Sequence, residues 1–231
     1  MEQLINLIVI IALSYLVGSI PSAIIVSKRV FGFDIRERGS GNMGSTNAIR
    51  ILGWKWGLFV QAADILKGVI PVVIFANLLG RDIQISSGGF FEHITIVRMI
   101  AGISAVAGHV WSVFAGFRGG KGINTTAGML IAILPIDVII SIGIFIIAVL
   151  LSGYISLGSI SAAVAIPLSM IFRYNILRDY IPSYQILLYF SIALAVLILY
   201  THRANIKRLI KGTENRFSKL QVIKCKSKSS A

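Results

Sequence analysis

The stretch from Gly39 to Arg50 combines glycine with polar and cationic side chains in a pattern that suits phosphate binding. Its three glycines allow tight turns that aim backbone N–H groups inward at an anion. Serine, threonine and asparagine add side-chain donors, and the final arginine offers a bidentate fork. A merely flexible loop would not need the Thr-Asn pair followed by arginine. The candidate site residues here are Gly39, Ser40, Gly41, Asn42, Gly44, Thr46, Asn47 and Arg50.

A second stretch, Gly119-Gly120-Lys121-Gly122, lies just before a predicted helix. Unpaired N–H groups and the positive end of that helix dipole would face the same anion as Lys121. The pattern is not a Walker A loop, because Ala115 stands at its first glycine and Gly122 at its magnesium-binding Ser or Thr. The spacing therefore argues against nucleotide hydrolysis. The candidate residues are Gly119, Gly120, Lys121 and Gly122.

Four further polar residues are candidates, two of them with alternative interpretations. His109 is either a substrate contact or a hydrogen-bonded packing residue. If the last helix continues, His202 and Asn205 are three residues apart and share a face. Ser156, in the segment 154–159, is either a substrate contact or an ordinary helix cap. All four are candidate substrate-binding residues.

The composition is that of a membrane protein that crosses the bilayer several times. Of 231 residues, 56% are hydrophobic and 13% charged, and the apolar residues form long runs. The alternating segments of a membrane barrel are missing. A single cysteine, Cys225, excludes disulfides and a thiolate metal cluster. The net charge of +13 indicates basic cytoplasmic loops rather than nucleic-acid binding.

Apolar runs predict spans over about 4–26, 52–79, 94–116, 155–172 and 184–200. The run from Gly122 to Leu151 would measure roughly 45 Å as one helix, against a hydrocarbon core of about 30 Å. Two short helices that meet near Pro135 avoid placing proline and Asp137 deep in lipid. The predicted fold is therefore all-α, a polytopic membrane helix bundle of seven spans.

Charge predicts the orientation. Residues 202–231 carry a net charge of +8 and residues 28–50 a net charge of +3, so both segments should be cytoplasmic. Seven spans satisfy this with the amino terminus outside and the carboxyl terminus inside. We expect a membrane domain over 1–217 and a basic cytoplasmic tail over 218–231. All the polar stretches above then meet at the cytoplasmic face and form one phosphate-binding pocket.

Asp64 and Lys67 lie three residues apart inside the second predicted span. Charges at membrane depth are costly and are usually paired. We interpret these two as a structural pair that locks the helix to its neighbours rather than as catalytic groups.

At these residues the sequence resembles the bacterial acyl-phosphate:glycerol-3-phosphate acyltransferase family. The similarity runs from about Ser14 to Arg216 and includes the glycine-asparagine loop, the Gly-Gly-Lys-Gly element and the final His-x-x-Asn. Departures from the family pattern are mild: Ser45 replaces the usual alanine, Ser112 a common proline and Arg118 a frequent lysine.

The resemblance implies that the 1-hydroxyl of glycerol 3-phosphate attacks the carbonyl of acyl phosphate, giving lysophosphatidate and phosphate. It implies catalytic roles for Ser40, Arg50 and Lys121, no metal or cofactor, and a place in the bacterial cytoplasmic (inner) membrane among lipids. No histidine has aspartate five residues later, which argues against an acyl-CoA donor. The alternative function is a transporter of a phosphorylated anion, which would hold its anion near the midplane.

Overall fold

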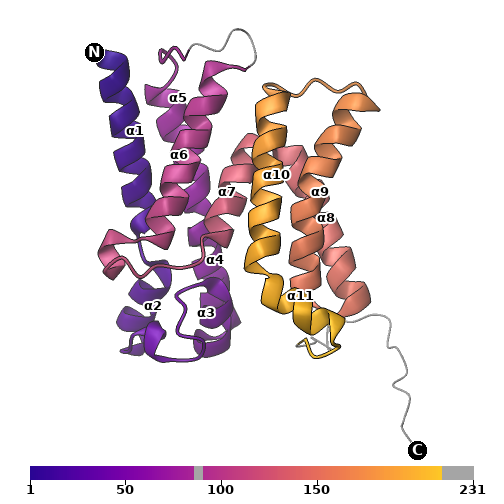
Figure 1. Ribbon diagram of the computed structural model, residues 1–231. Coiled ribbons are helices and arrows are strands. Elements are labelled where there is room, and N and C mark those ends of the chain that lie inside the picture. Colours follow the sequence, from indigo (N-terminus) through magenta and orange to yellow (C-terminus); the bar gives the residue numbers. More distant parts are fainter. Residues whose placement is uncertain (86–90, 215–231) are drawn as a thin grey trace, which may run out of the picture. The chain divides into compact units, whose positions relative to one another are not determined.

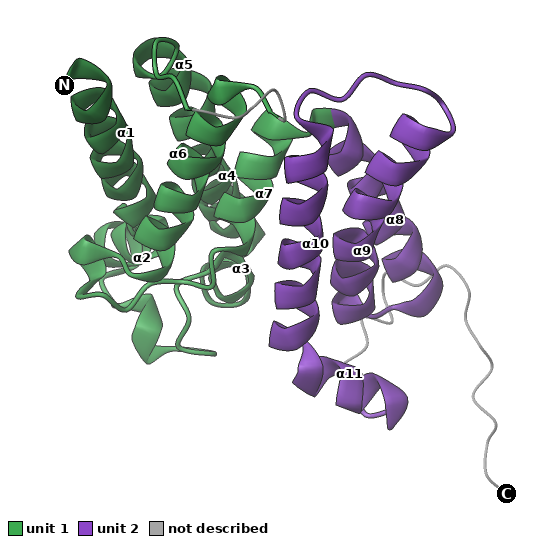
Figure 2. Ribbon diagram, turned by 45° about the horizontal axis from the view of Figure 1, so that its top comes forward, with its two compact units in different colours: residues 1–135 green, residues 136–231 purple. Residues whose placement is uncertain are grey.

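The computed structural model describes residues 1–85 and 91–214, and every regular element in these ranges is a helix (Figure 1). The predicted tail over 218–231, with Cys225, lies outside the described residues. The chain divides into unit 1, Met1–Pro135, and unit 2, Ile136–Ala231 (Figure 2). Unit 1 contains both glycine stretches, and unit 2 contains Ser156, His202 and Asn205.

The described residues of unit 1 form seven α-helices. They are α1 Glu2–Ser19, α2 Ser22–Phe31, α3 Ser45–Leu52, α4 Trp54–Ile70, α5 Ala76–Leu79, α6 His93–Val110 and α7 Ile123–Ile133. A π-helical segment, Pro71–Phe75, connects α4 to α5, and 3₁₀ turns occupy Ile35–Glu37 and Val113–Ala115. Helices α2 and α3 lie at one end of the unit, below α1 and α4 in Figure 1.

The first predicted span, 4–26, is not one helix. It breaks between α1 and α2 at Ile20 and Pro21. Proline lacks an N–H and keeps the preceding residue out of the helical region, and Ile20 has ψ 116°. The break leaves helical carbonyls without their usual donors, and the buried Ser112 hydroxyl donates to the Ser19 carbonyl.

Glycines bring the helix backbones of unit 1 into direct contact. A Cβ on Gly18 of α1 would lie 2.0 Å from the Ala105 carbonyl oxygen of α6. A Cβ on Gly68 of α4 would lie 2.1 Å from the Thr125 carbonyl oxygen of α7. Only a residue without a side chain permits this spacing, which is common between membrane helices. These contacts fix α7, and so the loop that precedes it.

Unit 2 contains α8 Pro135–Ser152, α9 Ile155–Asn175, α10 Tyr184–Thr201 and α11 Arg203–Ile210. The predicted helix break at Pro135 is confirmed, because α7 ends at Ile133 and α8 begins at the proline. Only α7 is short, since α8 has 18 residues. Asp137 is fully buried and paired with Arg173 of α9.

Six helical segments within the described ranges are long and apolar enough to cross a membrane: Glu2–Phe31, Trp54–Leu79, His93–Ala115, Pro135–Ser152, Ile155–Asn175 and Tyr184–Thr201. The seventh predicted crossing corresponds to α7, which is apolar but has only 11 residues. The described residues therefore form an all-helical bundle with six candidate membrane spans.

Candidate active site

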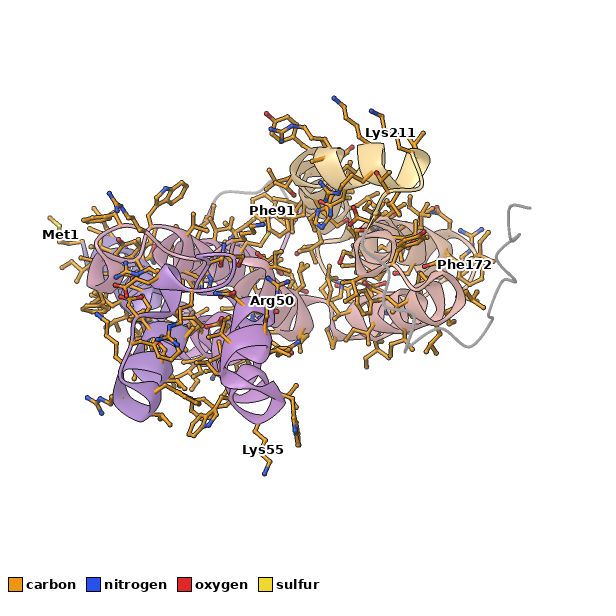
Figure 3. The ribbon with its side chains drawn as sticks, turned by 90° about the horizontal axis from the view of Figure 1, so that it is seen from below. Met1, Arg50, Lys55, Phe91, Phe172 and Lys211 are labelled. Atoms are coloured by element: carbon orange, nitrogen blue, oxygen red, sulfur yellow. The ribbon has the colours of Figure 1, made fainter. Side chains whose placement is uncertain are left out.

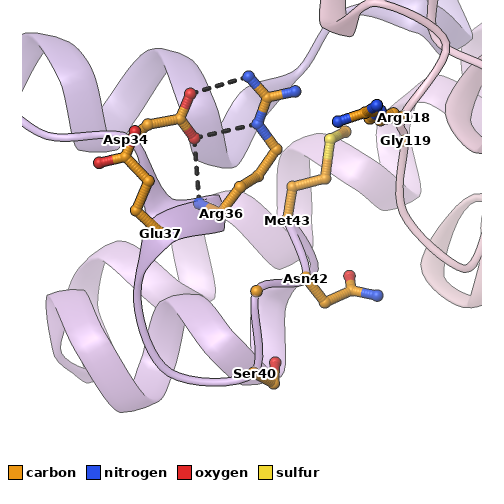
Figure 4. A pocket seen from close by; sticks show the side chains of 9 residues that line it. Asp34, Arg36, Glu37, Ser40, Asn42, Met43, Arg118 and Gly119 are labelled. Atoms are coloured by element: carbon orange, nitrogen blue, oxygen red, sulfur yellow. Dashed lines mark hydrogen bonds and ion pairs between the residues drawn. The ribbon is translucent and has the colours of Figure 1, made fainter.

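A cavity of about 520 Å³ opens at the α2–α3 end of unit 1 (Figure 4). Both glycine stretches contribute to it, from opposite sides. The first provides Ser40, Gly41 and Asn42, and the second provides Gly119. The remaining lining residues are Asp34, Arg36, Glu37, Met43 and Arg118. The lining has two arginines and two carboxylates, and Arg118 is the arginine that forms no ion pair among the described residues, which suits it to bind an anion.

Asn47 holds the first glycine loop in shape. Its side-chain oxygen accepts from the Ser40 N–H at 3.0 Å, and its amide donates to the carbonyls of Asn42 at 2.9 Å and Arg38 at 3.1 Å. The side chain is buried. Because these contacts occupy the amide, any effect of Asn47 on substrate binding acts through the loop's shape. This differs from the direct donor role expected for it.

Asp34 and Arg36 join the two loops. The Asp34 carboxylate accepts from the Arg36 side chain at 2.8 and 3.1 Å, and the same guanidinium donates to the Ala115 carbonyl at 3.0 Å. These hydrogen bonds from Arg36 hold the pKa of Asp34 well below its usual range. Asp34 in turn raises the pKa of Arg36. The pair thus stays charged, and through the Ala115 carbonyl it connects the segment before the first glycine stretch to the segment before the second.

The second glycine loop packs directly on His109. The N–H groups of Gly119 and Gly120 donate to the carbonyls of Val110 and His109, both at 3.1 Å. A Cβ on Gly120 would lie 2.2 Å from the His109 ring Nε2. His109 therefore supports the loop from behind, and its ring is buried. The ring is thus packed as the second interpretation expects, but it forms no hydrogen bond with any described residue.

The same histidine adjoins the predicted ion pair. Lys67 Nζ lies 2.6 Å from Asp64 Oδ1, with both side chains buried, so the pair is confirmed. His109 Nδ1 lies 3.9 Å from that oxygen and has no hydrogen-bond partner among the described residues. The charged cluster sits directly behind the Gly119-Gly120 turn.

The first turns of α3 and α7 are connected. The Asn124 amide of α7 donates to the Ser45 hydroxyl of α3 at 2.9 Å. Gly122 immediately precedes α7 and has φ 76°, a left-handed conformation that favours glycine. The predicted helix start after Gly119-Gly120-Lys121-Gly122 is confirmed.

The two predicted catalytic cations are exposed. Arg50 is in the last turn of α3, and Lys121 stands between Gly120 and Gly122. Neither forms an ion pair with any residue that the structure describes, and neither lines the cavity. Thr46 is exposed on α3. Figure 3 shows Arg50 and Lys55 at the end of unit 1 that faces the viewer.

In unit 2, the helix does not continue without a break through His202, which was the condition for His202 and Asn205 to share a face. Helix α10 ends at Thr201 and α11 begins at Arg203, with His202 between them. The Asn205 amide donates to Glu214 at 2.8 Å, and Arg208 pairs with the same carboxylate at 2.6 Å. Burial opposes ionisation of Glu214, but hydrogen bonds from Asn205 and Arg208 outweigh it and lower its pKa. The Asn205 side chain is therefore occupied by this carboxylate, and the buried Ser156 hydroxyl has no hydrogen-bond partner among the described residues.

Known proteins resemble this chain over nearly its whole length. The family described as glycerol-3-phosphate acyltransferase matches residues 8–212. The chain belongs to this family. A glycerol-3-phosphate acyltransferase from Chlorobaculum tepidum is 47% identical over 235 residues, which cover 93% of this chain and 98% of that protein. One from Chlorobium phaeobacteroides is 46% identical and covers 92% and 97%.

Solved structures of the family have a fold similar to that of this chain. PlsY, an integral membrane glycerol 3-phosphate acyltransferase, is 35% identical in its glycerol 3-phosphate form, with a TM-score of 0.71 over 93% of this chain and 96% of that one. Its lysophosphatidic acid form is 34% identical, with a TM-score of 0.70 over 93% and 97%. This member of the glycerol-3-phosphate acyltransferase family is therefore an integral membrane protein.

Sequence reasoning missed several residues of the site. Arg36 and Asp34 were counted only in the net charge of residues 28–50, although they connect the segments that precede the two glycine stretches. Arg118 was noted only as a departure from the family pattern, although it lines the cavity. The Asp-x-Arg spacing was a usable signal, since a carboxylate and a guanidinium two residues apart in a turn can pair.

Proposed function

We propose that this protein transfers an acyl group from acyl phosphate to the 1-hydroxyl of glycerol 3-phosphate, releasing lysophosphatidate and inorganic phosphate. One observation carries the proposal: in this member of the glycerol-3-phosphate acyltransferase family, the two glycine loops lie around one cavity that Arg118 also lines. Two phosphorylated substrates must approach closely in this reaction, so their repulsion has to be balanced by cations.

The chemistry requires positioning more than a reactive side chain. Acyl phosphate is a mixed anhydride with a good leaving group, so no enzyme nucleophile and no metal or cofactor is needed. Arg50 and Lys121 are exposed and form no ion pair within the part of the chain that the structure describes, which suits cations that bind substrate. Ser40 and the glycine-loop N–H groups are the proposed donors to the oxyanion that develops on the acyl carbonyl.

The proposed proton acceptor is the phosphate of glycerol 3-phosphate itself. Its second pKa, about 6, allows it to take the proton of the attacking hydroxyl. His109 is enclosed behind the second glycine loop and does not line the cavity. His202 and Asn205 are proposed to bind glycerol 3-phosphate. His202→Gln should therefore mainly raise KM, whereas loss of a general base would cost roughly 10²–10⁴-fold in kcat.

We further propose seven membrane crossings, with α7 as the short one, the amino terminus outside and the active site on the cytoplasmic face of the bacterial inner membrane. The basic segments 28–50 and 202–231 support this orientation. Family membership favours the enzyme over the anion transporter that the sequence alone left open.

The test uses the purified protein in detergent without divalent ions. With glycerol 3-phosphate and palmitoyl phosphate, the expected product is lysophosphatidate, formed in equal amounts when a chelator is present. Lys121→Ala should lower kcat by about 10²-fold, because one charge contact to the developing anion is lost. Arg50→Lys should raise KM, because a point charge cannot replace a bidentate fork.

Lys55→Ala is the matched control, since Lys55 is an exposed cation at the same end of unit 1. It should retain wild-type kinetics. Equal turnover with palmitoyl-CoA free of acyl phosphate would refute the proposed donor. Wild-type kinetics in both site variants would place the phosphate contacts elsewhere.

A further inference from the structure

Asp64, Lys67 and His109 form a buried cluster in unit 1 that the proposed reaction does not use. Their exposed fractions are 2%, 4% and 3%, and none of them lines the cavity. Asp64 and Lys67 are on α4, and His109 is in the last turn of α6. Ionisable groups inside a membrane protein are costly and are usually kept because they serve a function. Pairing explains how Asp64 and Lys67 are accommodated, but it does not explain why a histidine lies beside them.

The Asp64 carboxylate faces both of the other side chains. Its Oδ1 atom accepts from Lys67 Nζ at 2.6 Å and lies 3.9 Å from His109 Nδ1. The second distance is too long for a hydrogen bond, but a buried carboxylate still attracts an N–H dipole at this range because little solvent screens it. Since Nδ1 has no hydrogen-bond partner among the described residues, we expect the carboxylate to favour the tautomer with its proton on Nδ1.

The opposite side of the His109 ring meets the second glycine loop. A Cβ on Gly120 would lie 2.2 Å from the ring Nε2 atom and 3.1 Å from Cδ2. The Gly120 N–H donates to the His109 carbonyl at 3.1 Å. Both the ring and the backbone of His109 therefore hold Gly120, and the next residue is Lys121. A displaced or reoriented ring would move the backbone that carries this lysine.

The same stretch of α4 supports the helix that follows Lys121. Gly68 is next to Lys67, and a Cβ on it would lie 2.1 Å from the Thr125 carbonyl oxygen in the first turn of α7. Lys121 therefore lies between two supports. One is the histidine that faces Asp64, and the other is the α4–α7 contact beside Lys67.

We propose that Asp64, Lys67 and His109 are positioning residues, which act through the second glycine loop to place Lys121 for acyl transfer. Lys67 neutralises the carboxylate of Asp64, Asp64 orients the His109 ring, and the ring fixes the loop. The inference rests on the proposed function, in which Lys121 meets the charge that develops on the leaving phosphate. A catalytic group that is misplaced by about 1 Å can cost 10²-fold in rate.

A neutral replacement of the pair separates positioning from stability. Removing one partner strands a buried charge, whereas replacing both by apolar residues of similar volume is often neutral for stability. Asp64→Leu combined with Lys67→Met should therefore keep the thermal midpoint in detergent. It should lose about tenfold or more in kcat/KM for lysophosphatidate formation from palmitoyl phosphate. Unchanged kcat/KM would overturn the proposal, because a pair that only joins helices does not affect turnover.

A conservative variant tests the contribution of the carboxylate. In Asp64→Asn combined with Lys67→Met, the amide oxygen can still face the Nδ1 proton of His109. This variant should recover most of the lost kcat/KM. Equal losses in the two double variants would overturn the role given to Asp64.

Combination with Lys121→Ala identifies the route by which the cluster acts. If the cluster acts by placing this lysine, Asp64→Leu with Lys67→Met should cost less than about twofold once the lysine side chain is absent. A full loss in the Lys121→Ala background would contradict the inference. A wild type that forms no lysophosphatidate from palmitoyl phosphate would instead overturn the proposed function beneath it.

Asn77 and Arg98 provide the matched control on the same helix. The Arg98 Nε and Nη2 atoms donate to Asn77 Oδ1 at 3.1 and 2.9 Å, which links α6 to α5. On α6 Arg98 is about 16 Å from His109, at 1.5 Å for each residue between them. Asn77→Leu combined with Arg98→Met should therefore keep wild-type kcat/KM. A loss as large as that of the cluster variant would show that any loosening of α6 lowers activity, and would overturn the proposal.

Nitrogen-15 NMR of the histidine rings tests the orientation of His109 in the unmutated cluster. The chain has three histidines, so His93→Gln and His202→Gln identify the His109 signals by elimination. In mildly alkaline buffer His109 should carry its proton on Nδ1, and Asp64→Leu with Lys67→Met should abolish that preference. A proton on Nε2 in the wild-type cluster would contradict the inference even if the cluster variants fail to fold.

Discussion

The two units contain buried charge clusters that differ in how completely their members are paired. In unit 2, Asp137 accepts from Ser169 and from Arg173, both at 2.7 Å, and Arg173 also donates to Asp179 at 2.9 Å. In unit 1, Asp64 binds Lys67, but His109 Nδ1 beside it has no hydrogen-bond partner among the described residues.

This difference in pairing agrees with the part of the molecule that lies next to each cluster. The unit 2 cluster connects α8, α9 and the turn after α9, and its charges are satisfied, as buried charges in a structural role must be. The unit 1 cluster lies against the Gly119-Gly120 turn of the cavity. Incompletely satisfied buried groups are rare in native proteins, and perturbed groups concentrate at functional sites. Perturbing the unit 2 cluster should therefore change stability, and perturbing the surroundings of the unit 1 cluster should change activity.

The largest expected effect is on unit 2. Arg173→Met leaves Asp137 buried without its cation and should destabilise the protein by about 3–5 kcal/mol. Thermal unfolding in detergent measures this, and specific activity of the protein that remains folded should be unchanged. Arg178→Met, at an exposed site nearby, is the control and should alter the midpoint little. Equal losses in the two variants would show that the unit 2 cluster is not structural.

In unit 1, Gly120→Ala should cost about 10²-fold in kcat/KM while folding is retained, because its methyl group would displace the loop from His109 Nε2. His109→Ala makes room, so the same substitution should cost much less in that background. Gly119→Ala would meet the His109 carbonyl instead and should not be rescued. Rescue of both glycine variants, or of neither, would contradict this geometry.

The third effect concerns pH. Arg36 depresses the pKa of Asp34 in the folded protein below its unfolded value of about 3.9. The stabilisation is therefore present above pH ~4 and is lost as pH falls towards the folded pKa. Asp34→Asn should lower stability by about 1.5–3 kcal/mol at pH 7, and its difference from wild type should shrink below pH ~4. A constant difference would mean that the carboxylate's charge is not what matters.

The smallest effect tests the link between the two loops. Ser45→Ala removes the acceptor of the Asn124 amide and should cost about 0.5–1.5 kcal/mol in stability. Asn124→Ala should cost a similar amount, and the double variant little more than either. Strict additivity would show that this hydrogen bond contributes nothing.

Much of the fold could be predicted from local signals. The helix break at Pro135 follows from proline chemistry, and the Asp64–Lys67 pair follows from the cost of charge in lipid. The break at Pro21 has the same cause, yet the sequence analysis predicted one span over 4–26, because an apolar run by itself does not show where the helix axis changes direction.

The site could be predicted only in part. Residue types identified both glycine loops, but a type does not specify where its side chain points. Asn47 has the donors of a phosphate ligand and uses them on loop carbonyls. Arg36 connects to a carbonyl 79 residues away, a contact that local patterns do not encode. His202 and Asn205 were placed on one helix face, which the bend at His202 interrupts.

In the proposed topology of seven crossings, the shortness of α7 has a consequence for the lipid around the protein. Eleven residues rise about 16 Å, roughly half of a typical hydrocarbon core, whereas α4 and α6 beside it belong to full-length segments. Where a hydrophobic segment is too short, the bilayer thins to meet it, at a cost for each ångström of mismatch. Lipids with short acyl chains should therefore stabilise the protein relative to lipids with long ones, so bilayer thickness itself becomes a variable to which this fold responds.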